Sequence, residues 1–207
     1  MLLNTLIGAI VQLIAFALLP FLVYLIVKRT AKGFFRYIGL YKTNASALLL
    51  ALLAALVIGG AGIAVMCSSP VIRQVATGKG AVTEQISQLT SPANRVMVIL
   101  IIALIKTSLA EELLFRGFIA KRLIAWLGFR VGNLLQAVLF GAVHILLFLR
   151  LPGVTVAFLS FSFLLPGIAG YVAGYLNEKK GAGSIYPGWV LHGLTNIISY
   201  SFLVFMS

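Results

Sequence analysis

A long apolar run opens the chain: LLNTLIGAIVQLIAFALLPFLVYLIV, residues 2–27. It contains no acidic, basic or histidine residue, and its 26 residues exceed the roughly 20 that a transmembrane helix needs. It lacks the basic start of a signal peptide and is longer than the apolar part of one. We therefore expect a retained first span, kinked at Pro20.

Five similar runs follow, at about 46–67, 96–116, 131–149, 154–176 and 184–206. They predict an all-α, polytopic integral membrane protein of about six transmembrane helices, with residues 1–207 forming one membrane domain. Of the residues, 61% are apolar and 10% are charged, whereas a soluble domain carries about 25% charged residues. A soluble globular protein and a disordered chain are therefore excluded.

Two local patterns predict how the chain turns and packs. Residues 68–94 form the longest polar stretch and are expected to be a loop with a short surface helix, bounded by Pro70 and Pro92. Small residues recur in two spans, as Gly170-x-x-x-Gly174 and around Gly59, and small residues allow close contact between membrane helices. We expect these glycines to lie at helix–helix contacts.

Basic residues dominate the charge, with 16 Lys and Arg against four acidic residues and a net charge of +12. Lys106 falls within a span, four basic residues lie on one side of the predicted membrane, and eleven lie on the other. The eleven are Lys28, Arg29, Lys32, Arg36, Lys42, Arg116, Lys121, Arg122, Arg130, Lys179 and Lys180. The positive-inside rule makes their side cytoplasmic and places both termini outside. The basic excess indicates contact with anionic membrane lipid, and no nucleic-acid binding is expected, because no basic run is interleaved with aromatic residues.

Both histidines and two of the four glutamates fall in or near predicted spans: Glu111, Glu112, His144 and His192. An ionisable side chain inside a membrane costs about 2.5–3.5 kcal/mol on insertion scales. Such residues persist when they pair with one another or line a watery cavity. We therefore expect these four side chains to form a functional site.

The third span carries the two adjacent glutamates. Glu112 and Arg116 are four residues apart on one helical face, which favours an ion pair. Adjacent residues on a helix point about 100° apart, so Glu111 is expected to point elsewhere and to have no such local partner. Glu111 is therefore the carboxylate more available for chemistry.

The fourth and sixth spans contribute two further pairs at the same spacing, Phe140 with His144 and His192 with Asn196. A glutamate and a histidine can hold and deprotonate a water. Two histidines and a glutamate also form a ligand set that suits zinc. His192 and Asn196 could donate hydrogen bonds to a developing oxyanion.

Three motifs, in this order, resemble those of the CAAX-protease and bacteriocin-processing family, whose eukaryotic members are the type II CAAX prenyl endopeptidases. The motifs are Glu111-Glu112-x-x-x-Arg116, Phe140-x-x-x-His144 and His192-x-x-x-Asn196. The resemblance covers about residues 93–200, which would form the catalytic core. It implies an intramembrane endopeptidase of the glutamate or metallo type.

The resemblance also implies roles for single residues. Glu111, with His144, would bind and activate the water, and His192 with Asn196 would stabilise the oxyanion. Supporting positions would be Glu112, Arg116 and Phe140. A zinc ion held by Glu111, His144 and His192 is compatible with the same residues, as is a water activated without metal.

The implied partners are membrane lipid and a peptide or protein substrate cleaved near the membrane. The small bacterial members of the family are the most similar in length, which implies a bacterial-type plasma membrane with the cavity open to the cytoplasm. For Glu111 and His144 to meet, the third helix must continue past Arg116 to about residue 122.

Two other functions remain open at the level of sequence. The glutamate and histidine set could serve as a proton relay in a small proton-coupled transporter. The chain could also be a non-catalytic membrane protein, such as a bacteriocin-immunity or scaffold protein that keeps the protease fold.

Overall fold

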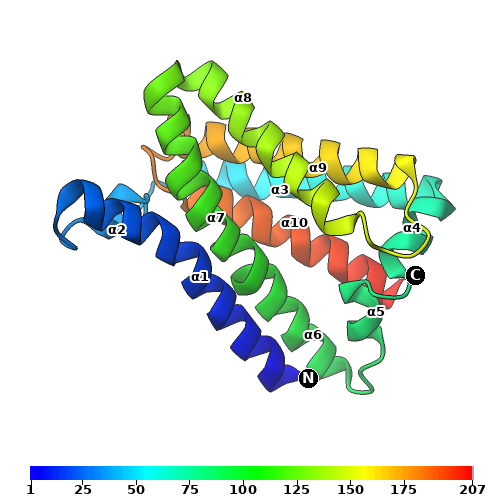
Figure 1. Ribbon diagram of the computed structural model, residues 1–207. Helices are drawn as coiled ribbons and strands as arrows, with labels where there is room; N and C mark the ends of the chain where they lie inside the picture. Colours follow the sequence, from blue (N-terminus) through cyan, green and yellow to red (C-terminus); the bar gives the residue numbers. More distant parts are fainter. Residues whose placement is uncertain (207) are drawn as a thin grey trace.

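The computed structural model describes residues 1–206, and these form helices and connecting segments without a strand (Figure 1). In chain order the elements are α1 (Leu2–Lys28), α2 (Phe34–Tyr37), α3 (Ala45–Ser68), α4 (Pro70–Thr77), α5 (Val82–Ser87), α6 (Pro92–Leu100), η1 (Ile101–Leu109), α7 (Ala110–Leu114), η2 (Phe115–Ala120), α8 (Lys121–Phe148), α9 (Val156–Tyr175), η3 (Leu176–Lys180) and α10 (Tyr186–Phe205). The three η elements are π-helical. The predicted all-α class is confirmed.

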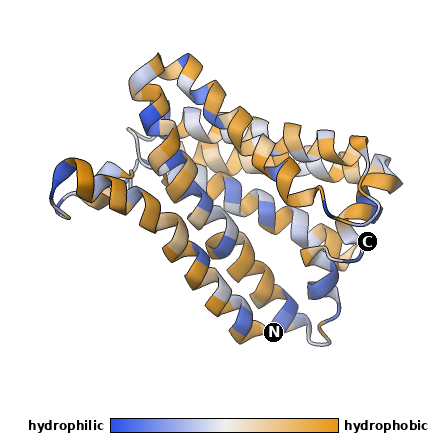
Figure 2. Ribbon diagram, viewed as in Figure 1, coloured by the Kyte–Doolittle hydropathy of each residue, from blue (hydrophilic) through white to orange (hydrophobic). Residues whose placement is uncertain are grey.

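Four helices in the described chain are long and apolar enough to cross a membrane. They are Leu2–Lys28, Ala45–Ser68, Val156–Lys180 and Tyr186–Phe205, which match the first, second, fifth and sixth predicted spans. Figure 2 shows how apolar residues dominate the helices. The protein is therefore an integral membrane protein. The third and fourth predicted spans fold as the helical stretches 92–120 and 121–148, which contain π-helical turns and a kink, and the count of six stays a prediction.

The polar stretch at 68–94 forms two short helices, α4 and α5, where one was expected. Pro70 and Pro92 each occupy the first position of a helix, where the missing N–H leaves no bond unmade. Ser69 and Ser91 precede them and accept hydrogen bonds from backbone N–H groups in the first turn, as N-caps do. The two prolines therefore mark the edges of this stretch, as predicted.

The third helix continues well past Arg116, as a site shared by Glu111 and His144 requires. Helical structure runs from Pro92 through η1, α7 and η2 into α8. The run is broken only at Gly128, whose φ of 77° and ψ of 165° are not helical, and the chain then turns back along the rest of α8 (Figure 1). Glycine adopts a positive φ without the steric cost that a side chain would add.

Helix α10 packs against α3, η1 and α9, while α8 packs along α9 and α1 along η1 and α7. Most of the small residues lie at these contacts, as predicted, but Gly60 is exposed and a methyl group there would meet no atom within 4 Å. A methyl group built on Gly59 would lie 3.0 Å from the Ile198 side chain of α10, and one on Gly62 would lie 3.1 Å from Leu165 of α9. Gly170 and Gly174 face α8 and its buried polar side chains.

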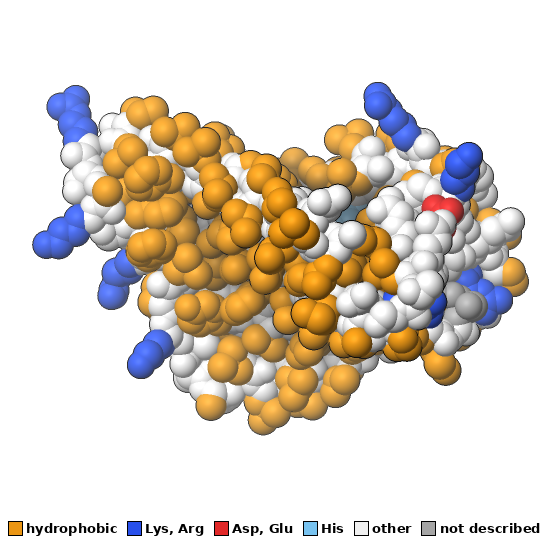
Figure 3. All heavy atoms as spheres, turned by 90° about the horizontal axis from the view of Figure 1, so that it is seen from below, with side chains coloured by type: hydrophobic (Ala, Val, Ile, Leu, Met, Phe, Trp, Pro, Cys, Tyr) orange, Lys and Arg blue, Asp and Glu red, His pale blue; other side chains and the backbone are white. Residues whose placement is uncertain are grey.

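Three chain segments meet at one end of the molecule, which we call the basic end: residues 29–44, the turn at Gly128, and residues 176–185. Hydrogen bonds join the first and third segments, from Tyr41 to the Ala182 carbonyl, from Asn44 to the Lys180 carbonyl, and from Ser184 to the Tyr41 carbonyl. Both termini lie away from this end (Figure 1). In the view of Figure 3, Lys and Arg side chains gather at the two sides, with apolar side chains between them.

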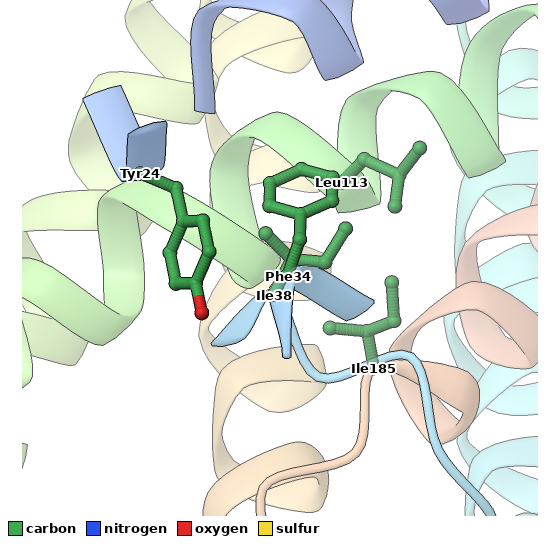
Figure 4. Close-up of a cluster of buried hydrophobic side chains, with 5 residues drawn as sticks. All are labelled: Tyr24, Phe34, Ile38, Leu113 and Ile185. Atoms are coloured by element: carbon green, nitrogen blue, oxygen red, sulfur yellow. The ribbon is translucent and has the colours of Figure 1, made fainter. Parts of the chain in front are cut away.

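A cluster of buried side chains fills the basic end (Figure 4). Its members are Tyr24, Phe34, Ile38, Leu113 and Ile185. Leu113 directly follows Glu112 in α7, and Ile185 directly precedes α10. The cluster therefore packs together the parts of the chain that carry the candidate site.

Candidate active site

Glu111 and Glu112 lie in α7, a short α-helical segment between the π-helices η1 and η2. π-helical turns shift the backbone hydrogen bonds by one residue and often occur at functional sites. In η1, two hydroxyls donate hydrogen bonds to backbone carbonyls five residues earlier. Thr107 Oγ1 lies 2.9 Å from the Ile102 carbonyl oxygen, and Ser108 Oγ lies 2.5 Å from that of Ala103. The irregular turns therefore satisfy their own polar groups on the approach to the glutamates.

Glu112 and Arg116 form the predicted ion pair, with 2.8 Å between Arg116 Nη1 and Glu112 Oε1. The two side chains are 0% and 2% exposed. The Arg116 guanidinium also lies 3.9 Å from the centre of the Phe140 ring, a cation–π contact. Gly170 of α9 leaves room for it, since a methyl group there would lie 2.5 Å from Arg116 Nη2.

His192 lies between the two adjacent glutamates. Its Nδ1 is 3.3 Å from Glu112 Oε1, and its Nε2 is 3.8 Å from Glu111 Oε2. The two carboxylates do point in different directions, but they approach one imidazole from its two nitrogens. Glu111 was expected to have no partner on its own helix, and the contact that it makes comes instead from His192 of α10.

His144 of α8 contacts Phe140 one turn earlier. The ring centres of Phe140 and His144 are 4.7 Å apart, and those of Phe140 and His192 are 5.6 Å apart, both edge to face. His144 Nδ1 lies 2.8 Å from the Phe140 carbonyl oxygen. Because that oxygen only accepts, Nδ1 carries the proton and the lone pair of Nε2 stays free.

Asn196 follows His192 by one turn of α10. Its Nδ2 donates a hydrogen bond of 3.0 Å to Thr107 Oγ1 of η1. An amide nitrogen has two N–H groups, so a second donor remains for another acceptor. The contact with Thr107 fixes the direction in which that donor points.

These side chains line one cavity of about 90 Å³ between α7, α8, α9 and α10. Its polar lining comprises Glu112, Arg116, His144, His192, Thr195, Asn196 and Ser199, beside Phe140 and the apolar residues of α9. A single water needs about 10–15 Å³, so the cavity has room for several waters or for a small part of a peptide. Glu111 is the one predicted site residue outside this lining. It is 13% exposed, and its buried Oε2 has no hydrogen-bond partner among the described residues.

A zinc site would need Glu111, His144 and His192 to converge on one point. No group of three or more His, Cys, Asp or Glu residues within residues 1–206 is arranged to hold a metal ion. Glu111 approaches His192 Nε2 directly and lies outside the cavity lining to which His144 belongs. The donor set does not fit a zinc ion in this arrangement.

Several polar side chains of the site region were missed in the sequence. Thr107 holds Asn196, and Trp189 Nε1 donates to the Leu104 carbonyl of η1 at 2.8 Å. Asn133 and Gln136 of α8 form a hydrogen bond with each other, and each also donates one to a backbone carbonyl of α9. Each has a side chain that can form hydrogen bonds and lies within an apolar helix, and this combination could have identified it in the sequence.

One comparison with known proteins finds a match. No curated protein and no solved structure matches the chain. The family model described as "Type II CAAX prenyl endopeptidase Rce1-like" matches residues 93–198, which is half of the chain and contains all three motifs. Its members' description indicates a peptidase of the CAAX type acting in a membrane. With the ordered glutamate, histidine and asparagine motifs now placed around one cavity, this match shows that the chain belongs to the Rce1-like family of type II CAAX prenyl endopeptidases.

Proposed function

We propose that this protein is an intramembrane endopeptidase that hydrolyses a peptide bond by means of a water activated by Glu111 and His144. The observation that carries the proposal is the cavity that Glu112, Arg116, His144, His192 and Asn196 line together, with Glu111 outside the lining but 3.8 Å from His192. Such charged and hydrogen-bonding groups are costly at membrane depth, and where they occur they mark functional sites or paths.

In the proposed reaction, His144 Nε2 accepts a hydrogen bond from the attacking water. Glu111 takes the proton as the water oxygen bonds to the peptide carbonyl carbon. The carboxylate would have to swing from His192 into the cavity, and its Oε2 has no hydrogen bond in the described chain that resists this motion. The proton then passes to the leaving amine as the C–N bond breaks.

The negative charge that develops on the carbonyl oxygen needs donors. The second N–H of Asn196 and the Nε2–H of a protonated His192 would supply them from one face of α10, once Glu111 has turned away from Nε2. Glu112, held by Arg116, orients the His192 ring through Nδ1. Glu112 therefore acts as a supporting residue, as the motif resemblance implies.

The proposed substrate is a peptide or protein whose scissile bond reaches the cavity from the cytoplasmic side of a plasma membrane of bacterial type. The orientation rests on the eleven basic residues of the predicted cytoplasmic side, which include the Lys121, Arg122 and Lys179 side chains at the basic end. His192 lies six residues into α10, or about 9 Å from the start of that helix.

The proposal is tested with purified protein in liposomes and a set of membrane-anchored peptides. We expect the wild type to cleave a subset of the peptides and His144→Ala to cleave none, with both proteins folded by circular dichroism. Equal cleavage by His144→Ala would contradict the mechanism. Absence of cleavage together with a pH change inside the vesicles would favour a transporter instead.

The same assay decides whether a metal takes part. If Glu111 and His144 activate the water without a metal, cleavage survives a chelator and metal analysis of the active protein finds no stoichiometric ion. Loss of cleavage with the chelator, and recovery with zinc, would require a rearranged site in which Glu111, His144 and His192 meet.

A further inference from the structure

Asn177 is a buried amide that the motifs do not include. It lies in η3, between α9 and α10, and is 1% exposed. Its Oδ1 accepts a hydrogen bond of 2.7 Å from the backbone N–H of Gly188, in the first turn of α10. Its Nδ2 is buried and has no hydrogen-bond partner in residues 1–206. An amide that uses only its acceptor leaves a buried donor to be explained.

A matching acceptor lies beside it. Glu112 places Oε1 against Arg116 and His192, but its Oε2 is also buried and unpartnered in the described chain. A methyl group built on Gly188 would lie 2.5 Å from Glu112 Oε2 and 2.7 Å from Asn177 Nδ2. The unpaired donor and the unpaired acceptor therefore flank the same point, which stays open because residue 188 is glycine.

We infer that Asn177 is a positioning residue of the active site, which donates a hydrogen bond from Nδ2 to Glu112 Oε2, directly or through one bound water. Through Nδ2, Asn177 then holds Glu112, the carboxylate that orients His192. Through Oδ1, it holds the first turn of α10, the helix that carries His192. Asn177 thus fixes the relative positions of α7 and α10, and Gly188 supplies the space for the contact. The inference rests on the proposed function for its catalytic consequence.

The alternative is that Asn177 only caps α10. Asn177→Asp separates the two roles, because aspartate keeps an oxygen for the Gly188 N–H but replaces the donor by a carboxylate next to Glu112. We expect Asn177→Asp to lower kcat about 10- to 100-fold, the usual effect of losing a partner that orients a functional ligand, with little change in KM. A cap-only role predicts wild-type kcat for Asn177→Asp, and that result would overturn the inference.

A second measurement tests the contact without relying on activity or on the folding of Asn177→Asp. Thermal midpoints are measured for Asn177→Ala, Glu112→Gln and the double variant. Coupled residues give effects that do not add, whereas independent sites give additive effects. Non-additive shifts support the contact, and additive shifts overturn it.

Gly188→Ala provides a third variant, with Gly60→Ala as its control, because a methyl group at Gly60 meets nothing within 4 Å. We expect Gly188→Ala to lose kcat and Gly60→Ala to keep it. Retained kcat in Gly188→Ala would overturn the inference. The proposed function would be contradicted by different results: a wild type that cleaves no peptide, or a Glu111 variant that still cleaves. The thermal midpoints of the Asn177 and Glu112 variants test the contact in either case.

Discussion

His192 Nδ1 lies 3.3 Å from Glu112 Oε1, the same oxygen that Arg116 Nη1 approaches at 2.8 Å. One carboxylate oxygen of α7 thus contacts both a cation of the adjoining π-helix η2 and an imidazole of α10. In the proposed mechanism the adjacent glutamates have different roles. Glu112 Oε1 contacts both Arg116 and His192, whereas Glu111 approaches His192 at the longer distance of 3.8 Å, between its Oε2 and Nε2.

The Glu112–Arg116 pair is expected to be essential for stability. Arg116→Met leaves a fully buried carboxylate without its cation, and breaking a buried pair in this way costs about 3–5 kcal/mol. Lys121→Met is the control, because its pair with Glu178 is more exposed, at 14% and 23%, and such pairs contribute about 1 kcal/mol or less. Thermal unfolding in detergent should show a much larger decrease for Arg116→Met. Equal decreases in the two variants would contradict a buried pair.

Gly170 is expected to accept no side chain, although alanine is ordinarily the better helix former by about 1 kcal/mol. A methyl group there would lie 2.5 Å from Arg116 Nη2 and 3.3 Å from the Phe140 ring. Gly170→Ala should therefore lower the thermal midpoint and the cleavage rate together, because Arg116 must move. A methyl group at Gly60 meets no atom within 4 Å, so Gly60→Ala should change neither the thermal midpoint nor the cleavage rate. A Gly170→Ala protein as stable as Gly60→Ala would show that the guanidinium is not confined by α9.

Thr107 is expected to act through Asn196. Thr107→Val keeps the shape but removes the oxygen that accepts from Asn196 Nδ2 at 3.0 Å, so the amide loses its fixed direction. We expect kcat to fall about 10- to 100-fold with KM nearly unchanged, measured by steady-state cleavage of a membrane-anchored peptide. Thr107→Ser keeps the hydroxyl and should restore most of the activity. A normal kcat in Thr107→Val would contradict the expectation that Asn196 acts at the oxyanion site in the direction that Thr107 gives it.

The sequence predicted the apolar helices well because hydropathy depends on composition over about 20 residues, and the membrane imposes that length. It also predicted the Glu112–Arg116 pair, which is local to one helical face. The convergence of Glu111 and Glu112 on His192 could not be predicted in the same way. It depends on how α10 crosses α7, and on π-helical turns that flank the glutamates and leave no mark in the spacing of apolar residues.

The roles of single polar residues were harder to predict for a similar reason. Asn177 contacts Gly188 across a turn of the chain, and Asn196 contacts Thr107 from a different helix. Such contacts arise from tertiary packing, so a residue's own neighbours in sequence do not reveal them. The cavity lining includes Glu112 but not Glu111, the residue expected to do the chemistry.

Peptide cleavage by Glu111→Gln beside Glu112→Gln, with thermal midpoints for both, decides whether Glu111 activates the water. Each substitution removes one charge at adjacent positions and keeps the shape of the side chain. A positioned general base typically contributes about 10²–10⁴-fold to the rate, so Glu111→Gln should lose about that factor in kcat while its thermal midpoint stays near that of the wild type. Glu112→Gln should lose stability through Arg116. Wild-type cleavage by a folded Glu111→Gln protein would contradict the claim that Glu111 activates the water.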